Sequence, residues 1–102
     1  MVQPNKQDVD LVKKAARGNR KAFTDLFQDH FQAVYNYALS LAGDPSLAED
    51  LTQEAFIRAH TNLEKLGSPW NFRAWVFRLT RNYFIDLIRS ERDTEPFNDE
   101  IQ

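Results

Sequence analysis

The stretch WNFRAWVFRLTRNYFIDLIRSER, residues 70–92, decides the expected fold because it reads as one long helix with two different sides. It contains neither glycine nor proline, the residues that most often interrupt a helix. One side is apolar at spacings of three and four, as a core-facing helix requires, and comprises Phe72, Trp75, Val76, Leu79, Tyr83 and Leu87. A second arc, about 100° wide on a helical wheel, comprises Arg78, Arg81, Asn82, Ile85, Arg89 and Arg92. We therefore predict a helix that packs on one side and presents arginine and asparagine on another.

The charge of this stretch contrasts with that of the whole chain. Residues 69–92 contain five arginines and two acidic residues, whereas the full 102-residue chain has a net charge of −2. Residues 93–102 are acidic and are interrupted by Pro96, which is typical of a linker or tail. A helix that bears Arg and Asn on an otherwise acidic protein indicates a surface for phosphates and bases.

The composition indicates one small folded domain. A chain of 102 residues with 42% hydrophobic residues suits a single core. The absence of cysteine excludes disulfides and thiolate metal sites. No apolar run approaches the roughly 20 residues that a membrane helix needs, and the N-terminus lacks the apolar core of a signal peptide. We therefore expect a cytoplasmic protein without membrane insertion.

Capping residues and glycines divide the first part of the chain into two helices. Asn5 is placed to cap a short first helix that Gly18 ends, and Asn19 is placed to cap the second. The second helix carries apolar residues at helical spacing throughout, namely Phe23, Leu26, Phe27, Phe31, Val34, Ala38 and Leu41.

Two further break signals define the third and fourth helices. Gly43 ends the second helix, and Asp44-Pro45 starts a third that we expect to run to about Lys65. Residues 66–69 then break the chain, and Ser68 with Pro69 starts the long fourth helix. Since no segment alternates as a strand does, we predict an all-α fold, a compact bundle of three main helices plus a shorter N-terminal helix. The helical domain is expected over residues 1–92 and an acidic linker or tail over residues 93–102.

The sequence gives little support to a catalytic or metal site. His30 and His60 are isolated, and no HExxH pattern or phosphate-binding glycine loop is present. His30 lies near the apolar side of its helix, so we interpret it as a packing or surface histidine. The acidic residues Glu49, Asp50 and Glu54 lack histidines at a matching spacing and indicate a solvated face. We expect no enzyme, no metal and no cofactor.

One side of the third helix holds a mixed group of polar and apolar residues. Asp50, Gln53, Glu54 and Ile57 step by three, one and three, so they share a side distinct from the apolar one. An ordinary solvated face is one interpretation. The other is a polar-rimmed docking surface for another protein, with Ile57 as its apolar centre.

The segment before the long helix offers two alternatives. Trp70 and Asn71, next to free backbone N–H groups, would be able to stack on and hydrogen-bond an unpaired base. In the other interpretation, this segment is a capping loop and Trp70 folds onto the core.

The arginine and asparagine arc also has two interpretations. It is either a solvated basic surface, with arginines pairing with Asp86 and Glu91, or a nucleic-acid surface. Asn82 favours the second, because asparagine has poor helix propensity and its amide, flanked by arginines, is equipped to contact a base edge.

Three blocks of sequence, in this order, resemble region 2 of bacterial sigma factors of the sigma-70 superfamily, most closely the extracytoplasmic-function group. AFTDLFQDHFQAVYNYA, residues 22–38, is similar to region 2.1. AEDLTQEAFIRAH, residues 48–60, looks like the region 2.2 helix that docks on the coiled coil of the RNA polymerase β′ subunit. FRAWVFRLTRNYFIDLIR, residues 72–89, looks like regions 2.3 and 2.4. Together the blocks cover the chain from about Gly18 to Arg92.

The resemblance implies a role for each of the surfaces described above. Polymerase binding falls to Asp50, Gln53 and Glu54, with Ile57 as a neighbour. Reading of the promoter −10 element falls to Asn82, and the contacts to phosphates or bases fall to Arg78, Arg81, Arg89 and Arg92. The loop that receives a flipped-out non-template base comprises Leu66, Gly67, Ser68, Trp70 and Asn71. Asp86 is expected to orient nearby arginines.

The function that the resemblance implies is transcription initiation without chemistry of the chain's own. The domain would bind core RNA polymerase, recognise the promoter −10 element and melt it by capturing single-stranded non-template bases. The alternative is a sigma-like interaction module that binds polymerase or an anti-sigma factor without sequence-specific DNA recognition. An anti-sigma factor is an expected partner by family resemblance.

Overall fold

The computed structural model describes residues 6–68 and 70–93, and four α-helices make up most of this part of the chain. They are α1 (Lys6–Ala16), α2 (Arg20–Ala42), α3 (Pro45–Thr61) and α4 (Phe72–Asp93), with the short 3₁₀ turn η1 (Leu63–Lys65) before α4. The described residues contain no strand, so the predicted all-α bundle of three main helices plus a shorter first helix is confirmed. None of the described helices is long and apolar enough to cross a membrane.

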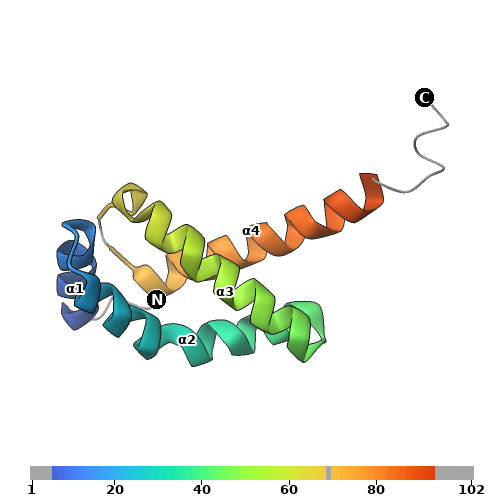
Figure 1. The fold of residues 1–102 in the computed structure, drawn as a ribbon, viewed down its shortest axis with the longest axis horizontal. Coiled ribbons are helices and arrows are strands. Elements are labelled where there is room, and N and C mark those ends of the chain that lie inside the picture. The colour runs from blue at the N-terminus through green and yellow to red at the C-terminus, as the bar shows by residue number, and fades with distance from the viewer. Residues whose placement is uncertain (1–5, 69, 94–102) are drawn as a thin grey trace.

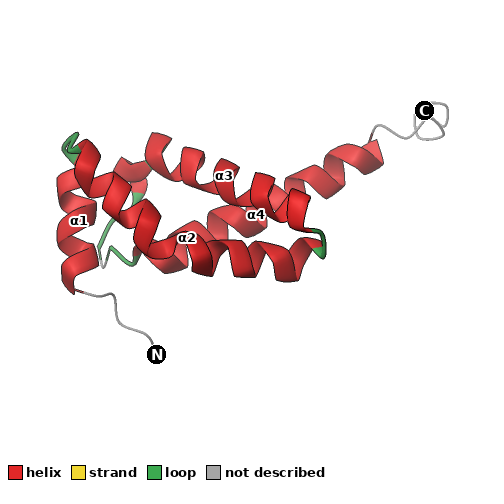
Figure 2. Cartoon of the chain, turned by 60° about the horizontal axis from the view of Figure 1, so that its bottom comes forward, coloured by secondary structure: helices red, strands yellow, loops and turns green. Residues whose placement is uncertain are grey.

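The helices form a hairpin, α2 and α3, against which α4 packs (Figure 1). Helix α1 lies across the end of the hairpin where α2 begins and α3 ends, and it contacts α2, η1 and α4. The last turns of α4 extend past the α2–α3 turn (Figure 2), and the longest dimension is 52 Å. The loop between η1 and α4 therefore lies at the same end of the bundle as α1.

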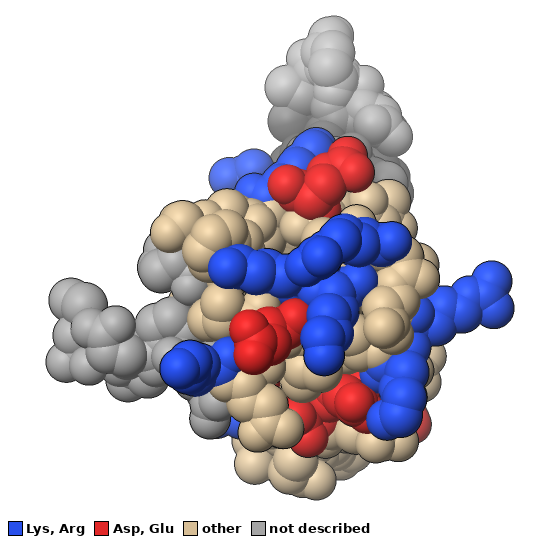
Figure 3. Space-filling view, turned by 90° about the vertical axis from the view of Figure 1, so that its left-hand side faces the viewer, with Lys and Arg blue, Asp and Glu red and all other residues tan. Residues whose placement is uncertain are grey.

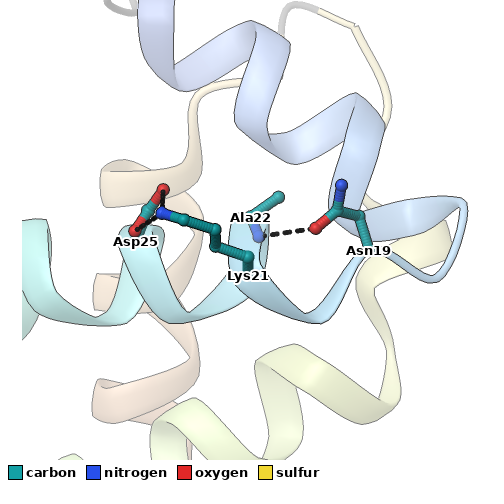
Figure 4. Close-up of polar contacts among 4 residues, drawn as sticks. All are labelled: Asn19, Lys21, Ala22 and Asp25. Carbon is teal, nitrogen blue, oxygen red and sulfur yellow. Dashed lines mark hydrogen bonds and ion pairs between the residues drawn. The ribbon is translucent and has the colours of Figure 1, made fainter.

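The start of α2 is fixed by the predicted cap. The side-chain oxygen of Asn19 accepts a 3.0 Å hydrogen bond from the backbone N–H of Ala22 (Figure 4). One turn of this helix also carries an exposed ion pair, with Lys21 Nζ 3.3 Å from Asp25 Oδ2. An Asn side chain that satisfies a free N–H group in the first turn stabilises a helix by about 1 kcal/mol.

The turn between α2 and α3 also forms as predicted. Gly43 adopts a φ of +73° and donates its N–H to the carbonyl of Leu39 over 2.8 Å, which ends α2. Asp44 then accepts a 2.8 Å hydrogen bond from the N–H of Leu47, with Pro45 at the first position of α3.

Two helix boundaries differ from the prediction. Helix α3 ends at Thr61 and not near Lys65. Asn62 is the cap residue, and both its backbone N–H and its side chain donate to the carbonyl of Arg58, over 2.9 Å and 3.0 Å. The chain then tightens into η1.

Helix α4 begins at Phe72 and not at Ser68 and Pro69. Trp70 has a φ of +56°, which a right-handed helix does not allow. Asn71 follows as the cap, and its side-chain oxygen accepts a 3.2 Å hydrogen bond from the N–H of Ala74. Pro69, like the predicted cap Asn5 and residues 94–102 of the expected tail, lies outside the described residues.

Two clusters of buried side chains make up the core. The larger one lies at the α1 end and joins all four helices through Val12, Leu26, Val34, Ala55, Phe56, Ala59, Leu63, Phe72 and Val76. The smaller one, Ala38, Ala48 and Leu51, lies near the α2–α3 turn under half-buried side chains of α4. The predicted apolar side of α4 is confirmed, since Phe72 and Val76 are buried and Trp75, Leu79, Tyr83 and Leu87 pack against the two clusters. His30 is buried as well, which confirms a packing histidine.

Backbone geometry at Gly43 predicts a stability difference. Replacing Gly43 with alanine should lower the free energy of unfolding by about 1–2 kcal/mol, because a Cβ atom disfavours the left-handed conformation. No atom would clash with that Cβ, so the cost is conformational. Gly67→Ala is the matched control, since this glycine lacks a positive φ and has open space around it. Chemical denaturation of both variants measures the difference, and equal effects would contradict the assignment.

Candidate nucleic-acid interface

The packing of α4 leaves its predicted arginine and asparagine residues in solvent. Phe72, Val76 and Thr80 are buried on one side, and successive residues rotate by about 100°. The far side therefore holds four exposed polar side chains, namely Arg78, Arg81, Asn82 and Arg89. None of these four makes a hydrogen bond or ion pair within the described part of the chain. Three cations and one amide are thus available to a ligand. The side chain of Arg92 lies outside the described residues.

A surface hollow of about 270 Å³ opens where the loop before α4 meets the first turns of that helix. Its lining residues are Lys65, Leu66, Gly67, Ser68, Asn71, Ala74, Trp75 and Arg78. Five of them, Leu66, Gly67, Ser68, Asn71 and Arg78, are residues that the sequence predicted to bind DNA. The hollow combines apolar and aromatic walls with a hydroxyl, an amide and two cations. Such a set suits a planar polar group that carries a nearby negative charge.

Three lining residues, Lys65, Ala74 and Trp75, were not predicted as site residues. Trp75 was assigned to the apolar side of the helix, but it is only half-buried and also faces the hollow. Its position at the margin between the apolar side and the exposed arc was the signal in the sequence. Lys65 was expected at the end of the third helix, and the earlier end of that helix places it in η1, at the edge of the hollow.

Trp70 lies beside the hollow but does not line it. Its half-buried ring packs against the larger core cluster, and Lys13 Nζ lies over the ring, 4.4 Å from a ring centroid. The backbone N–H of Trp70 donates a 2.8 Å hydrogen bond to the carbonyl of Gly67. Of the two alternatives for this residue, the structure shows the one in which Trp70 folds onto the core. The positive φ of a bulky residue costs about 1–2 kcal/mol, so packing must hold this conformation in place.

The predicted docking side of α3 is exposed and continues into an apolar groove. Asp50 and Gln53 are exposed, Glu54 is half-buried, and Ile57 is 58% exposed although it is a large apolar residue. A groove of about 410 Å³ runs beside them between α2 and α3, lined by Phe23, Phe27, Gln53, Phe56, Ile57, His60 and Thr61. Polar side chains that border an exposed apolar centre are typical of protein interfaces. The contribution of α2 was not predicted, although its phenylalanines recur at a spacing of four.

Arg58 joins the two predicted surfaces. Its Nε lies 3.1 Å from Glu54 Oε2 on α3, its Nη1 lies 3.8 Å from Asp86 Oδ2 on α4, and its guanidinium lies over Tyr83 at 4.5 Å. Asp86 was expected to orient nearby arginines, and the arginine that lies next to it is Arg58 of α3. The spacing of four between Glu54 and Arg58 was a signal in the sequence for that ion pair. The contact between Arg58 and Asp86 depends on how α3 and α4 pack against each other.

The α1 end of the molecule, next to the hollow, is rich in cations. Figure 3 looks onto this end and shows lysine and arginine over much of the face, with smaller acidic patches between them. Exposed cations on α1, on the turn that follows it, on η1 and at the start of α4 include Lys13, Lys14, Arg17, Lys65 and Arg73. Clustered positive charge raises the local concentration of a polyanion.

Comparison with known proteins gives one consistent result. The family described as Sigma-70 region 2 matches residues 26–94. The chain is 32% identical over 81 residues to the ECF RNA polymerase sigma factor SigW of Bacillus subtilis, an alignment that covers 79% of this chain and 43% of that protein. It is 38% identical over 82 residues to the ECF RNA polymerase sigma factor SigL of Mycobacterium tuberculosis, covering 79% and 46%. It is 37% identical over 82 residues to the RNA polymerase sigma factor NccH of Alcaligenes xylosoxydans xylosoxydans, covering 80% and 44%. The chain spans less than half the length of each of these relatives.

Proposed function

Since the chain belongs to the sigma-70 region 2 family, we propose that it is the part of a transcription initiation factor that binds core RNA polymerase and recognises the promoter −10 element. One observation carries the DNA part of this proposal. The exposed arc of α4 and the hollow before it adjoin each other, and Arg78 belongs to both. A single strand would therefore contact cations, an amide and a base-sized recess on one continuous surface.

In the proposed mode of recognition, some side chains contact the DNA backbone and others contact the bases. Arg78, Arg81 and Arg89 hold phosphates, which positions the strand without reading its sequence. Asn82 offers an amide donor and acceptor to the edge of one unpaired base. A second base leaves the stack and enters the hollow, where Trp75 supplies an aromatic surface and Ser68 and Asn71 supply hydrogen-bonding groups.

Melting follows from binding energy alone in this proposal. Opening a base-pair step costs about 1.4 kcal/mol on average, and each stacked or captured base returns about 1–3 kcal/mol. Capture of two bases together with phosphate contacts is therefore comparable to the cost of opening a few steps. The chain breaks no bond, and the polymerase carries out the chemistry.

Polymerase docking is assigned to the exposed side of α3. Ile57 supplies an apolar anchor, and Asp50, Gln53 and Glu54 supply a polar and acidic border. We propose the coiled coil of the β′ subunit as the partner. Docking also supplies affinity that the DNA surface lacks by itself, because few phosphates are neutralised and salt weakens such binding steeply.

A second function draws support from the apolar groove between α2 and α3. The groove and the docking side of α3 together suit a protein partner, either polymerase or an anti-sigma factor. In this alternative the chain binds protein and has no sequence-specific contact with DNA. Binding to β′ without any base preference at the promoter would favour it over the first proposal.

Asn82→Ala tests the base contact. The variant, assembled with core polymerase, should bind single-stranded −10 DNA about ten-fold more weakly, because a base-edge contact of about 1–3 kcal/mol is lost. Fluorescence anisotropy with labelled oligonucleotides measures the change. Asn36→Ala is the control, since Asn36 is also exposed but lies on α2. Equal affinity of parent and Asn82→Ala, with unchanged promoter melting, would contradict the assignment.

Asp50→Ala and Gln53→Ala test the polymerase contact. Each variant should be retained about five- to ten-fold less by an immobilised β′ coiled-coil fragment, because a polar group that borders the Ile57 anchor is lost. Asp29→Ala, which removes an exposed carboxylate from α2, provides the matched control. If all three variants are retained like the parent, β′ docks elsewhere.

A further inference from the structure

A buried histidine joins three helices next to the hollow. His30 on α2 is 4% exposed, and its Nε2 lies 2.8 Å from Asp8 Oδ2 on α1. Its Nδ1 accepts a 3.1 Å hydrogen bond from Arg73 Nε at the start of α4. Because a guanidinium N–H only donates, Nδ1 must act as the acceptor. With Nδ1 as the acceptor, the N–H group at Nε2 is the one that faces Asp8.

The series of hydrogen bonds from Asp8 through His30 to Arg73 ends at the segment that forms the hollow. Arg73 stands between the cap residue Asn71 and the lining residue Trp75 in the sequence, within the first turn of α4. The His30 ring also packs against the ring of Phe72, with centroids 5.3 Å apart. The chain of hydrogen bonds thus fixes where α4 begins relative to α1 and α2.

A second contact from α1 reaches the loop itself. Lys13 lies over the ring of Trp70, and Trp70 has the unfavourable positive φ that turns the loop. A strained residue keeps its conformation only where its surroundings determine it. Helix α1 therefore contacts Trp70, before the cap of α4, directly through Lys13, and it reaches Arg73, after the cap, through His30 of α2. Leu66, Gly67 and Ser68 of the hollow precede these two contacts, and Asn71 lies between them.

We propose that α1 positions the loop that lines the hollow, and that Asp8 and His30 are positioning residues for base capture although neither lines the hollow. For its consequence on DNA binding, this inference rests on the proposed function. The physical reason is preorganisation. A loop held in one shape does not lose further conformational entropy when a base enters, so binding is tighter and more selective.

Two substitutions of the same histidine separate hydrogen bonding from packing. His30→Leu fills the site but removes the donor and the acceptor. His30→Gln keeps one donor for Asp8 and one acceptor for Arg73. Val34→Ala is the control for lost stability, because Val34 is fully buried one turn further along α2 and belongs to the larger core cluster, as Phe72 beside His30 does.

The first readout needs no DNA. Amide hydrogen exchange at residues 66–68, 70 and 71 should become about ten-fold faster in His30→Leu than in Val34→Ala, with melting temperatures measured for both. His30→Gln should restore exchange to near the parent rate. Equal exchange at these amides in His30→Leu and Val34→Ala would overturn the inference, and so would a His30→Gln variant that behaves like His30→Leu.

The second readout is base selectivity of the domain assembled with core polymerase. His30→Leu should bind single-stranded −10 oligonucleotides about five-fold more weakly and with a flatter preference among the four bases, while retention by the β′ fragment stays unchanged. Unchanged selectivity despite faster exchange would overturn the role in base capture. If the parent itself shows no base preference, the proposed function fails, and the exchange result still decides whether α1 positions the loop.

Discussion

The burial of Phe72, Val76 and Thr80 in the bundle is the constraint on which the other features of the molecule depend. These residues fix the rotation of α4 about its own axis. Once that rotation is set, the helical repeat determines on which side of the helix each remaining side chain lies. Arg78, Asn82 and their neighbours must then face solvent on the far side. The exposed arc is thus a consequence of core packing, and the core is where its geometry is determined.

Two surfaces on different helices share one side chain. Arg58 contacts Glu54 within the proposed polymerase surface and Asp86 on the helix proposed to bind DNA. The contacts are partly exposed, so each contributes little to stability. Their value lies in fixing the relative positions of two helices whose outer faces have different proposed partners. A polymerase that docks on α3 would in this way meet a DNA surface that is already oriented.

Three helix boundaries that depend on local chemistry were predictable, whereas the end of α3 at Asn62 and the start of α4, which depends on packing, were not. Asn19, Gly43 and Asp44 act within one turn of themselves, so the sequence alone placed them correctly. Proline at position 69 suggested a helix start, but Asn71 caps α4 because Trp70 turns the chain to reach the core and Lys13.

The same distinction applies to the candidate site. The exposure of the arginine arc was predictable from the helical period. The position of the apolar side determines which residues lie on the opposite, exposed side. The partners of His30 and of Asp86 come from helices far away in the sequence, 22 residues away for Asp8 and 43 for Arg73. No local pattern encodes such pairs. The hollow also required the early end of α3, which brings Lys65 to its edge.

In the proposed complex, DNA lies on the outer face of α4 and polymerase lies on the outer face of α3. Photo-crosslinking tests it most directly, with a photoreactive amino acid in place of Asn82 in one sample and of Ile57 in another. Each protein is assembled with core polymerase and promoter DNA before irradiation. We expect a crosslink from position 82 to the non-template strand and from position 57 to the β′ subunit. Crosslinks from position 82 to protein alone, or from position 57 to DNA, would contradict it.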